Sequence, residues 1–405
     1  MRPQVSAPTG AMGLDFVAFY TAGAAVREGR ARDLYDLDAT NRFQQALQQE
    51  QGVAIGRRFA PWWNPPFYSL LFVPLSRLPF HAALLVWSLV SVLCAAGACV
   101  LLRRILPSGA DWRSRALVPA LILISTPFIA TLTHGQNSCM SLLLLTVTVV
   151  LWRAGKPLAA GLSGGLLFFK PQLAFVLAAV MILDLGWRAA LGYAITGTIL
   201  LALNLLVLPG TLGAFVHQVP LNLELVQSQS GYPWERHVTF KAFWRVLIQG
   251  NEPGATRWAA GSLGMLCACA LGAMLVSATL KARTVGITPL TRDGLIAATI
   301  AMTPLLMPFY FDYDLLLLAV PAVLLSGEAL RRPQVSLQPI LIGAWVLFYV
   351  WMMVNPDVAE RFHVNLAAPL LAVLSVALLR RVRETAECVN EAESPVLIWR
   401  STSPQ

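Results

Sequence analysis

The sequence predicts an all-α polytopic membrane protein, and two observations carry that prediction. Of the 405 residues, 57% are hydrophobic and only 13% are charged, whereas an average soluble domain carries about 25% charged residues. The apolar runs are spread along almost the whole chain, and a membrane-crossing helix takes about 20 residues of this kind. This composition excludes a disordered chain and argues strongly against an ordinary soluble enzyme.

About eleven membrane helices follow from the apolar runs. Several runs are short, and short or Gly/Pro-interrupted segments at membrane depth usually line a cavity, because lipid cannot satisfy a broken backbone. The candidate spans lie near residues 80–102, 116–133, 138–152, 158–169, 173–186, 189–208, 257–280, 294–308, 315–327, 337–354 and 365–379. We therefore predict a transmembrane domain at 80–379 with an external loop at 209–256. An external segment, 1–79, precedes it, and a disordered cytoplasmic tail, 380–405, follows it.

The basic residues predict how this bundle is oriented. The net charge is +9, which in a soluble protein would suggest nucleic-acid binding. No basic stripe interleaved with aromatics occurs, so we expect no nucleic-acid partner. With this number of spans the basic clusters all fall on one face, which the positive-inside bias makes the cytoplasmic one. They are Arg103, Arg104, Arg113 and Arg115; Arg153 and Lys156; Arg188; Lys281, Arg283 and Arg292; Arg331 and Arg332; and Arg380, Arg381 and Arg383.

The remaining polar segments then gather on the outer face, where an outward-facing active site would need them. The N-terminus would lie on that face too. Residues 1–14, however, contain no apolar stretch of the signal-peptide kind that could carry it across the bilayer. We therefore expect a further N-terminal helix to be missing from the chain.

Asp15 opens a segment, 15–35, that reads as an amphipathic helix lying in the membrane interface. A carboxylate at the first turn of a helix is commonly an N-cap, and spacing alone favours that interpretation for Asp15. Further on, Trp62-Trp63-Asn64-Pro65-Pro66-Phe67 suits an interfacial aromatic belt. A turn with interfacial anchors explains that stretch adequately, and only its combination with Asp15 indicates more.

Lys170 is the most informative single residue. It is one of only four lysines, and it interrupts an apolar run next to Pro171. A cation at the bilayer centre costs about 2.5–3.5 kcal/mol on insertion scales. Binding of an anionic phosphate and snorkelling of the side chain to the interface are both consistent with this position.

Two further polar stretches stand between apolar runs. His134-Gly135-Gln136-Asn137 is either a tight polar turn or a cluster of hydrogen-bond donors beside an external cavity. In the second stretch, Asp312 and Asp314 flank Tyr313. These carboxylates either end a helix pair or position a sugar, since aromatic faces with carboxylate acceptors suit hydroxyl-rich ligands.

Several chemistries lack support in the sequence. No Walker A, G-x-G-x-x-G, H-E-x-x-H or G-x-S-x-G pattern occurs in its required context, which argues against ATP-driven transport, dinucleotide chemistry and zinc proteolysis. The six cysteines form no C-x-x-C pair, and all but Cys388 lie in apolar runs. We interpret them as small hydrophobes rather than as disulfides or zinc ligands.

Taken in order, the polar motifs resemble glycosyltransferase family 87, from about Asp15 to about Leu330. Each motif is weakly specific, and the ordered set is moderately specific. The resemblance rests on Asp15-Phe16, Asp33-Leu34-Tyr35-Asp36, Trp63-Asn64-Pro65-Pro66, the run from Pro74-Leu75 to Leu78-Pro79, Gly135-Gln136-Asn137, Lys170-Pro171-Gln172 and the stretch from Tyr310 to Asp314.

This resemblance implies a GT-C-type bundle with an outward-facing cavity in the bacterial cytoplasmic (inner) membrane. It implies transfer of a hexose, expected to be mannose, from a polyprenyl-phosphate donor to a glycan or glycolipid acceptor on the periplasmic or exterior face. A carboxylate after the first membrane helix serves as catalytic base in such enzymes, and Asp15 matches that position. No cofactor or metal is expected, because polyprenyl phosphate is already a good leaving group.

The remaining roles follow from the chemistry of inverting transfer, which needs one base and donors that stabilise the departing phosphate. We predict that Lys170 contacts the donor phosphate. Its predicted helpers are His134, Gln136, Arg361 and His363. The predicted sugar- or acceptor-binding residues are Asn64, Asn137, Tyr310, Asp312, Tyr313 and Asp314.

Two rival functions stay open. A flippase or transporter of a lipid-linked glycan would also use an outward cavity and an intramembrane lysine, but it predicts inverted repeats, and none is visible. An O-antigen-ligase-like or acyltransferase enzyme would rely on a long external loop with Arg and His. The loop 209–256, with His217, Arg236 and His237, keeps that alternative alive.

Overall fold

All regular structure in the computed structural model is helical over the residues that it describes, 12–53, 60–106, 112–331 and 338–393. Within these residues, three helices are long and apolar enough to cross a membrane: α3 (Phe80–Ile105), α9 (Trp187–Val207) and α12 (Trp258–Val285). The all-helical membrane fold is therefore confirmed. Every predicted span falls on a helical segment, but the count of about eleven crossings stays a prediction.

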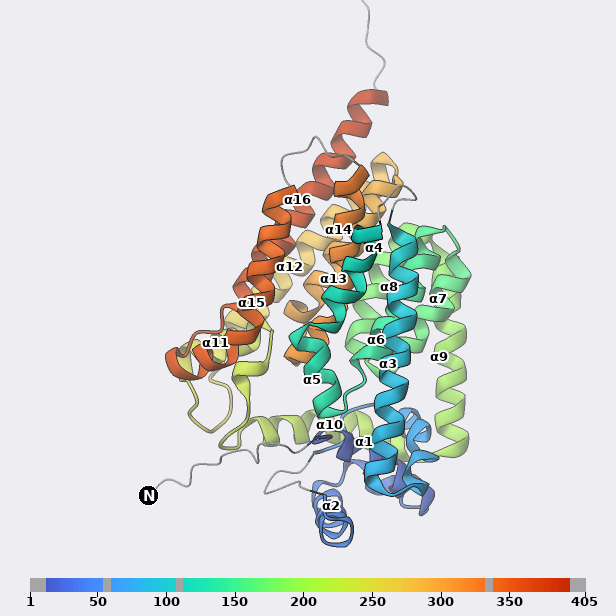
Figure 1. The fold of residues 1–405 in the computed structure, drawn as a ribbon, viewed down its shortest axis with the longest axis vertical. Coiled ribbons are helices and arrows are strands. Elements are labelled where there is room, and N and C mark those ends of the chain that lie inside the picture. The colour runs from blue at the N-terminus through green and yellow to red at the C-terminus, as the bar shows by residue number, and fades with distance from the viewer. Residues whose placement is uncertain (1–11, 54–59, 107–111, 332–337, 394–405) are drawn as a thin grey trace, which may run out of the picture.

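The helices stand roughly side by side as an upright bundle (Figure 1). Besides the three long helices, the bundle contains α4 (Trp112–Leu123), α5 (Thr126–His134), α6 (Ser138–Arg153), α7 (Pro157–Gly165), α8 (Pro171–Leu185), α13 (Pro289–Leu306), α14 (Ala319–Arg331), α15 (Gln338–Phe362) and α16 (Ala367–Glu393).

In several of the predicted spans the α-helix is interrupted. The span predicted at 116–133 consists of two helices, because Ser125 caps a new helix by accepting a hydrogen bond from the Phe128 amide at 3.1 Å, and Pro127 lies in the first turn of that helix. Tight 3-10 turns complete two other spans, η4 (Leu166–Phe169) after α7 and η6 (Asp312–Leu318) before α14. Two of these interruptions present the polar motifs: η4 ends at Lys170, and η6 contains Asp312 and Asp314.

The N-terminal segment folds against the first turns of α3. It consists of α1 (Phe16–Arg27), η1 (Ala31–Tyr35), α2 (Leu37–Gln51), η2 (Pro66–Phe72) and η3 (Leu75–Arg77). The first helix ends at Arg27 rather than continuing to residue 35, and its residues 16–24 are all buried. Phe72 and Trp87 pack on Phe16, so residues 16–24 present no solvent-exposed polar face and this part of the helix is not amphipathic.

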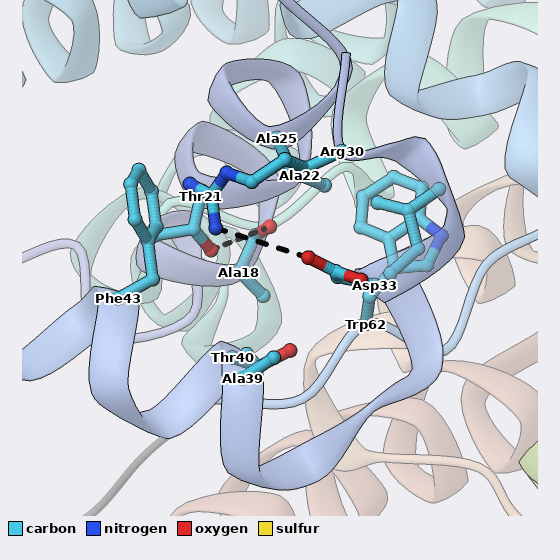
Figure 2. A pocket seen from close by; sticks show the side chains of 11 residues that line it. Ala18, Thr21, Ala22, Ala25, Arg30, Asp33, Ala39, Thr40, Phe43 and Trp62 are labelled. Carbon is cyan, nitrogen blue, oxygen red and sulfur yellow. Dashed lines mark hydrogen bonds and ion pairs between the residues drawn. The ribbon is translucent and has the colours of Figure 1, made fainter. Parts of the chain in front are cut away.

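Gly23 makes this close packing possible. A Cβ atom at residue 23 would lie only 2.4 Å from the carbonyl oxygen of Phe72, so any side chain would push η2 away from α1. Between α1, η1 and α2 a hollow of about 20 Å³ remains, where Figure 2 shows Arg30 and Asp33 joined across 3.9 Å. It has room for about one water molecule, and Asp15 does not line it.

The loop predicted to be external, 209–256, contains α10 (Thr211–Gln227), η5 (Trp234–Arg236) and α11 (Phe240–Gln249). In Figure 1, α10 lies crosswise beneath the bundle, beside the N-terminal segment. A short antiparallel bridge joins His237 to Phe311, and the Val238 amide donates to the Tyr310 carbonyl at 2.9 Å. The loop is therefore fixed to the residues that precede η6.

The opposite end of the bundle carries the basic clusters that the charge pattern grouped together. Ion pairs join Arg153 to Asp293, Arg292 to Asp184 and Arg381 to Glu328, so the basic loops share one end. Helix α16 continues through residues 380–393, where the sequence predicted a disordered tail. Residues 394–405 of that predicted tail lie outside the described residues.

Candidate active site

Polar side chains from five distant segments meet at the end of the bundle that carries α1. The segments are the start of α1, the turn between α5 and α6, the turn between η4 and α8, η5, and η6 with the residues just before it. Their side chains form two layers. The outer layer consists of the partly exposed Asp15, His134, Gln136, Arg236 and Asp312 together with the buried Tyr313; the inner layer, almost fully buried, consists of Asn137, Ser138, Lys170, Tyr310 and Asp314.

Asp15 stands at the N-cap position of α1, but its carboxylate does not cap the helix. Instead, its Oδ2 atom accepts a hydrogen bond from Gln136 Nε2 at 2.9 Å and lies 3.6 Å from His134 Nδ1. The preference for a cap, drawn from spacing alone, was wrong. The Asp15 side chain is one-third exposed, so a ligand can reach its free oxygen.

A glycine turn positions the partners of Asp15. Gly135 has φ of 70° and ends α5, which allows His134 and Gln136 to lie on either side of it. A Cβ atom at this residue would come within 2.6 Å of the Phe16 side chain, so the turn packs directly on the start of α1. The Asp15 amide also donates to the His134 carbonyl at 3.0 Å, which ties the two segments together.

Arg236 brings a positive charge to the outer layer. It binds both oxygens of Asp312, at 2.8 and 3.0 Å, and its Nη1 lies 3.3 Å from His134 Nε2. Because arginine only donates, His134 Nε2 accepts, which leaves the proton of a neutral imidazole on Nδ1, toward Asp15. Gln136 completes the layer, since its Nε2 also lies 3.1 Å from the Tyr313 hydroxyl.

Burial and charge fix the protonation of two loop residues. Burial alone would lower the pKa of Arg236, but its hydrogen bonds to Asp312 raise that pKa above its ordinary value. Burial, with help from Arg236 and Lys241, lowers the pKa of His237 to about 3. At neutral pH, Arg236 is therefore charged and His237 is neutral.

The inner layer is a closed polar network. Asp314 accepts hydrogen bonds from the Lys170 ammonium and from the Ser138 hydroxyl, and Tyr310 donates to the Asp314 carbonyl at 3.1 Å. Lys170 is only 7% exposed, so it does not snorkel to the interface, and its charge is already paired with a carboxylate. Burying a paired charge is far less costly than burying a lone one.

Asn137 belongs to the same layer, and only part of its side-chain hydrogen-bonding capacity is used. Its Nδ2 donates to the Tyr68 hydroxyl at 3.2 Å, while its buried Oδ1 has no hydrogen-bond partner among the described residues. Asn64 follows Trp63, whose ring lies 6.5 Å from that of Phe309, the residue before Tyr310. The backbone carbonyl of Asn64 accepts from the Tyr35 hydroxyl at 2.7 Å.

Two predicted residues stand apart from this constellation. Arg361 and His363 are exposed at the end of α15, where His363 packs against Gly250. None of the described hydrogen bonds or ion pairs joins either residue to the two layers, so their predicted role as phosphate helpers stays a prediction. Among the described residues, no group of three His, Cys, Asp or Glu side chains is arranged to hold a metal ion.

Arg236 is the residue that sequence reasoning assigned differently. It entered the analysis only as support for a ligase-like alternative, because its partner Asp312 is 76 residues away in the sequence. The available signal was its place in the external loop, on the face predicted to hold the active site. Chemically, the outer layer offers a carboxylate that can accept a proton next to a fixed cation that can stabilise an anion.

Comparison with known families adds the remaining information. The family model of glycosyltransferase family 87 matches residues 62–308, which is more than half of the chain and includes His134, Gln136, Lys170 and Arg236, but neither Asp15 nor Asp312. No curated protein and no solved structure matches the chain. The chain therefore belongs to glycosyltransferase family 87, and it is a glycosyltransferase with membrane-spanning helices.

Proposed function

We propose that this glycosyltransferase moves a hexose, expected to be mannose, from a polyprenyl-phosphate donor to a glycan or glycolipid acceptor. In this proposal the helices form a GT-C-type bundle in the bacterial cytoplasmic membrane, with the two polar layers facing the periplasm or exterior. The short basic loops between the membrane helices lie at the end opposite these layers, which supports that orientation, because basic residues in short loops favour the cytoplasmic side.

The observation that carries the proposal is the position of Asp15. Its carboxylate is drawn away from the helix that it begins and is held by Gln136, with one side open to ligand. An acceptor hydroxyl that attacks the anomeric carbon must lose its proton, and a positioned carboxylate can take it. The bond from the anomeric carbon to the donor phosphate oxygen breaks as the new glycosidic bond forms, and the phosphate leaves with that electron pair.

The departing phosphate needs positive charge or hydrogen-bond donors nearby. Arg236 and His134 of the outer layer supply both, and they are connected to each other. Lys170, the first candidate for this role, already binds Asp314 in the inner layer. We therefore propose that Lys170 acts through Asp314 by holding η6 in place, and that direct contact with phosphate falls to Arg236.

The sugar and the acceptor would lie over the outer layer. Tyr313 and Asp312 offer an aromatic face and a carboxylate there, with Asn64 at the edge. Asn137, Tyr310 and Asp314 lie beneath and support these groups rather than touching substrate directly, apart from the spare Oδ1 of Asn137. No step in this scheme requires a metal or a cofactor.

The donor class can be tested with the full chain in nanodiscs. We would supply polyprenyl-phosphate-mannose labelled in the sugar and measure loss of label from the lipid, whether by transfer or by release to water. We expect turnover with this donor and none with nucleotide sugars. Turnover with nucleotide sugars alone would contradict the proposal. Movement of the intact glycolipid across the bilayer without loss of the sugar would instead support a flippase.

A further inference from the structure

A hollow of about 310 Å³ opens at the end of the bundle away from Asp15. It lies between the last turns of α3 and α6 and the first turn of α13, and each of these helices contributes one arginine: Arg104, Arg153 and Arg292. Figure 1 shows α3 rising from the N-terminal segment to this opposite end. The proposed reaction uses none of these residues.

Two of the three arginines are held rigidly. Arg153 donates through Nε and Nη2 to Asp293, at 2.5 and 2.9 Å, and Arg292 donates through Nε and Nη2 to Asp184, at 2.6 and 2.9 Å. Each pairing leaves the Nη1 amino group of the arginine without a hydrogen bond in the described part of the chain. The two carboxylates thus fix the guanidinium planes and leave donors that a further anion can use.

The third arginine is not neutralised within the described residues. Arg104 is exposed, and no hydrogen bond or ion pair to it is formed there. Within the described residues, Asp293 offsets the charge of Arg153 and Asp184 offsets that of Arg292, so the charge of Arg104 is the one left over. The hollow is therefore positively charged, and its size suits a phosphate group with a few attached atoms.

The surroundings of Arg104 indicate that the anion belongs to a lipid. Leu93, Val100 and Arg104 lie on one face of α3, because Val100 follows Leu93 by seven residues and Arg104 follows Val100 by four. Leu93 is 70% exposed and Val100 is 51% exposed, which is the state of side chains that face acyl chains in a bilayer. The apolar face of α3 thus leads directly to the basic hollow, whose wall also includes Ile105 and Val150.

We propose that this hollow binds the phosphate headgroup of an anionic phospholipid, with an acyl chain lying along the Leu93 and Val100 face of α3. Basic pockets between membrane helices are suited to such headgroups. The site would anchor the ends of α3, α6 and α13 to one leaflet, at a distance from the transfer chemistry.

The test uses the full chain purified in detergent and exposed to phosphatidylglycerol or phosphatidylcholine with the same acyl chains. Native mass spectrometry then measures how much of each lipid the protein retains. We expect preferential retention of phosphatidylglycerol, weakened about fivefold by Arg104→Gln. Arg103→Gln is the matched control, because Arg103 is also exposed at the end of α3 but does not line the hollow.

A second variant tests the cavity itself. Ala154→Trp adds a large side chain to the wall of the hollow and leaves all three arginines in place, so we expect it to weaken phosphatidylglycerol retention as Arg104→Gln does. Equal retention of the two lipids by the unmodified protein, or no effect of either variant, would overturn the proposal. Displacement of the lipid by inorganic phosphate at equal concentration would also overturn it, in favour of a free-anion site. Lipid retention does not depend on glycosyl transfer, so the result is independent of the proposed function.

Discussion

The outer and inner polar layers contain the same kinds of side chain, yet their surroundings differ. Asp15 in the outer layer is one-third exposed and has an oxygen open to ligand. Asp314 in the inner layer is 7% exposed, and its Oδ1 accepts from both Lys170 and Ser138. A carboxylate that is buried and paired with an ammonium group holds structure together, whereas one that is partly exposed and has no such cation bound to it is available for chemistry. The comparison therefore separates candidate catalytic residues from candidate scaffold residues.

The largest expected effect on activity comes from Asp15. Removing a general base costs about 10²–10⁴-fold in rate, so Asp15→Asn is expected to lose that much turnover with the lipid-linked donor while its thermal unfolding in detergent changes little. Asp33→Asn is the matched control, since Asp33 lies in the same N-terminal segment with only a weak ion pair to Arg30. Equal turnover in both variants would remove Asp15 from the chemistry.

The inner layer should respond in stability instead. Lys170→Met leaves Asp314 buried without its main partner, and breaking such a pair costs about 3–5 kcal/mol in the free energy of unfolding. We expect a clear fall in the thermal unfolding temperature, with a smaller fall in the double variant Lys170→Met/Asp314→Leu, which buries no lone charge. If Lys170→Met unfolds normally but loses donor binding, Lys170 contacts the phosphate after all.

Arg236 combines features of both layers, because it lies in the partly exposed outer layer but is also paired with a carboxylate, Asp312. Arg236→Gln removes the proposed phosphate partner, and we expect kcat/KM for the donor to fall about 10²-fold. Arg257→Gln is the control, because Arg257 lies in the same external loop region with an exposed ion pair to Glu252. An unchanged kcat/KM for Arg236→Gln would show that the phosphate binds elsewhere.

The smallest effect concerns pH. Because the pKa of His237 is lowered to about 3 from its ordinary value of about 6.5, the unfolded chain takes up a proton first as the pH falls below about 6.5. Stability is therefore lost from about pH 6.5 downward, by at most about 1.4 kcal/mol per pH unit. The variant His237→Gln should lose less stability than the unmodified protein between pH 7 and pH 5, measured by thermal unfolding; an identical loss would show that His237 is not neutral and buried.

Periodicity and composition predicted the helical membrane fold, because runs of apolar residues and the bilayer thickness leave few alternatives. They also predicted which motifs would share one end, since His134, Lys170 and Asp312 all lie at turns on the same side. The contacts themselves were beyond the sequence. Nothing local indicates that Gln136 draws the carboxylate of Asp15 away from its helix.

Packing explains two other differences from the sequence predictions. The polar residues at the end of 15–35 suggested one amphipathic helix, but aromatic side chains of η2 and α3 pack on α1, its residues 16–24 are buried, and a turn follows Arg27. Likewise, residues 380–393 are polar enough to suggest a tail, yet they continue α16, where Arg381 pairs with Glu328. Both outcomes depend on segments that are distant in sequence.

The most direct test measures turnover and thermal unfolding together for Asp15→Asn and Lys170→Met, with labelled polyprenyl-phosphate-mannose as donor. The account predicts that Asp15→Asn is folded like the unmodified protein but nearly inactive, and that Lys170→Met unfolds at a markedly lower temperature. Full turnover by Asp15→Asn, together with normal stability of Lys170→Met, would contradict the assignment of chemistry to the outer layer and of support to the inner one.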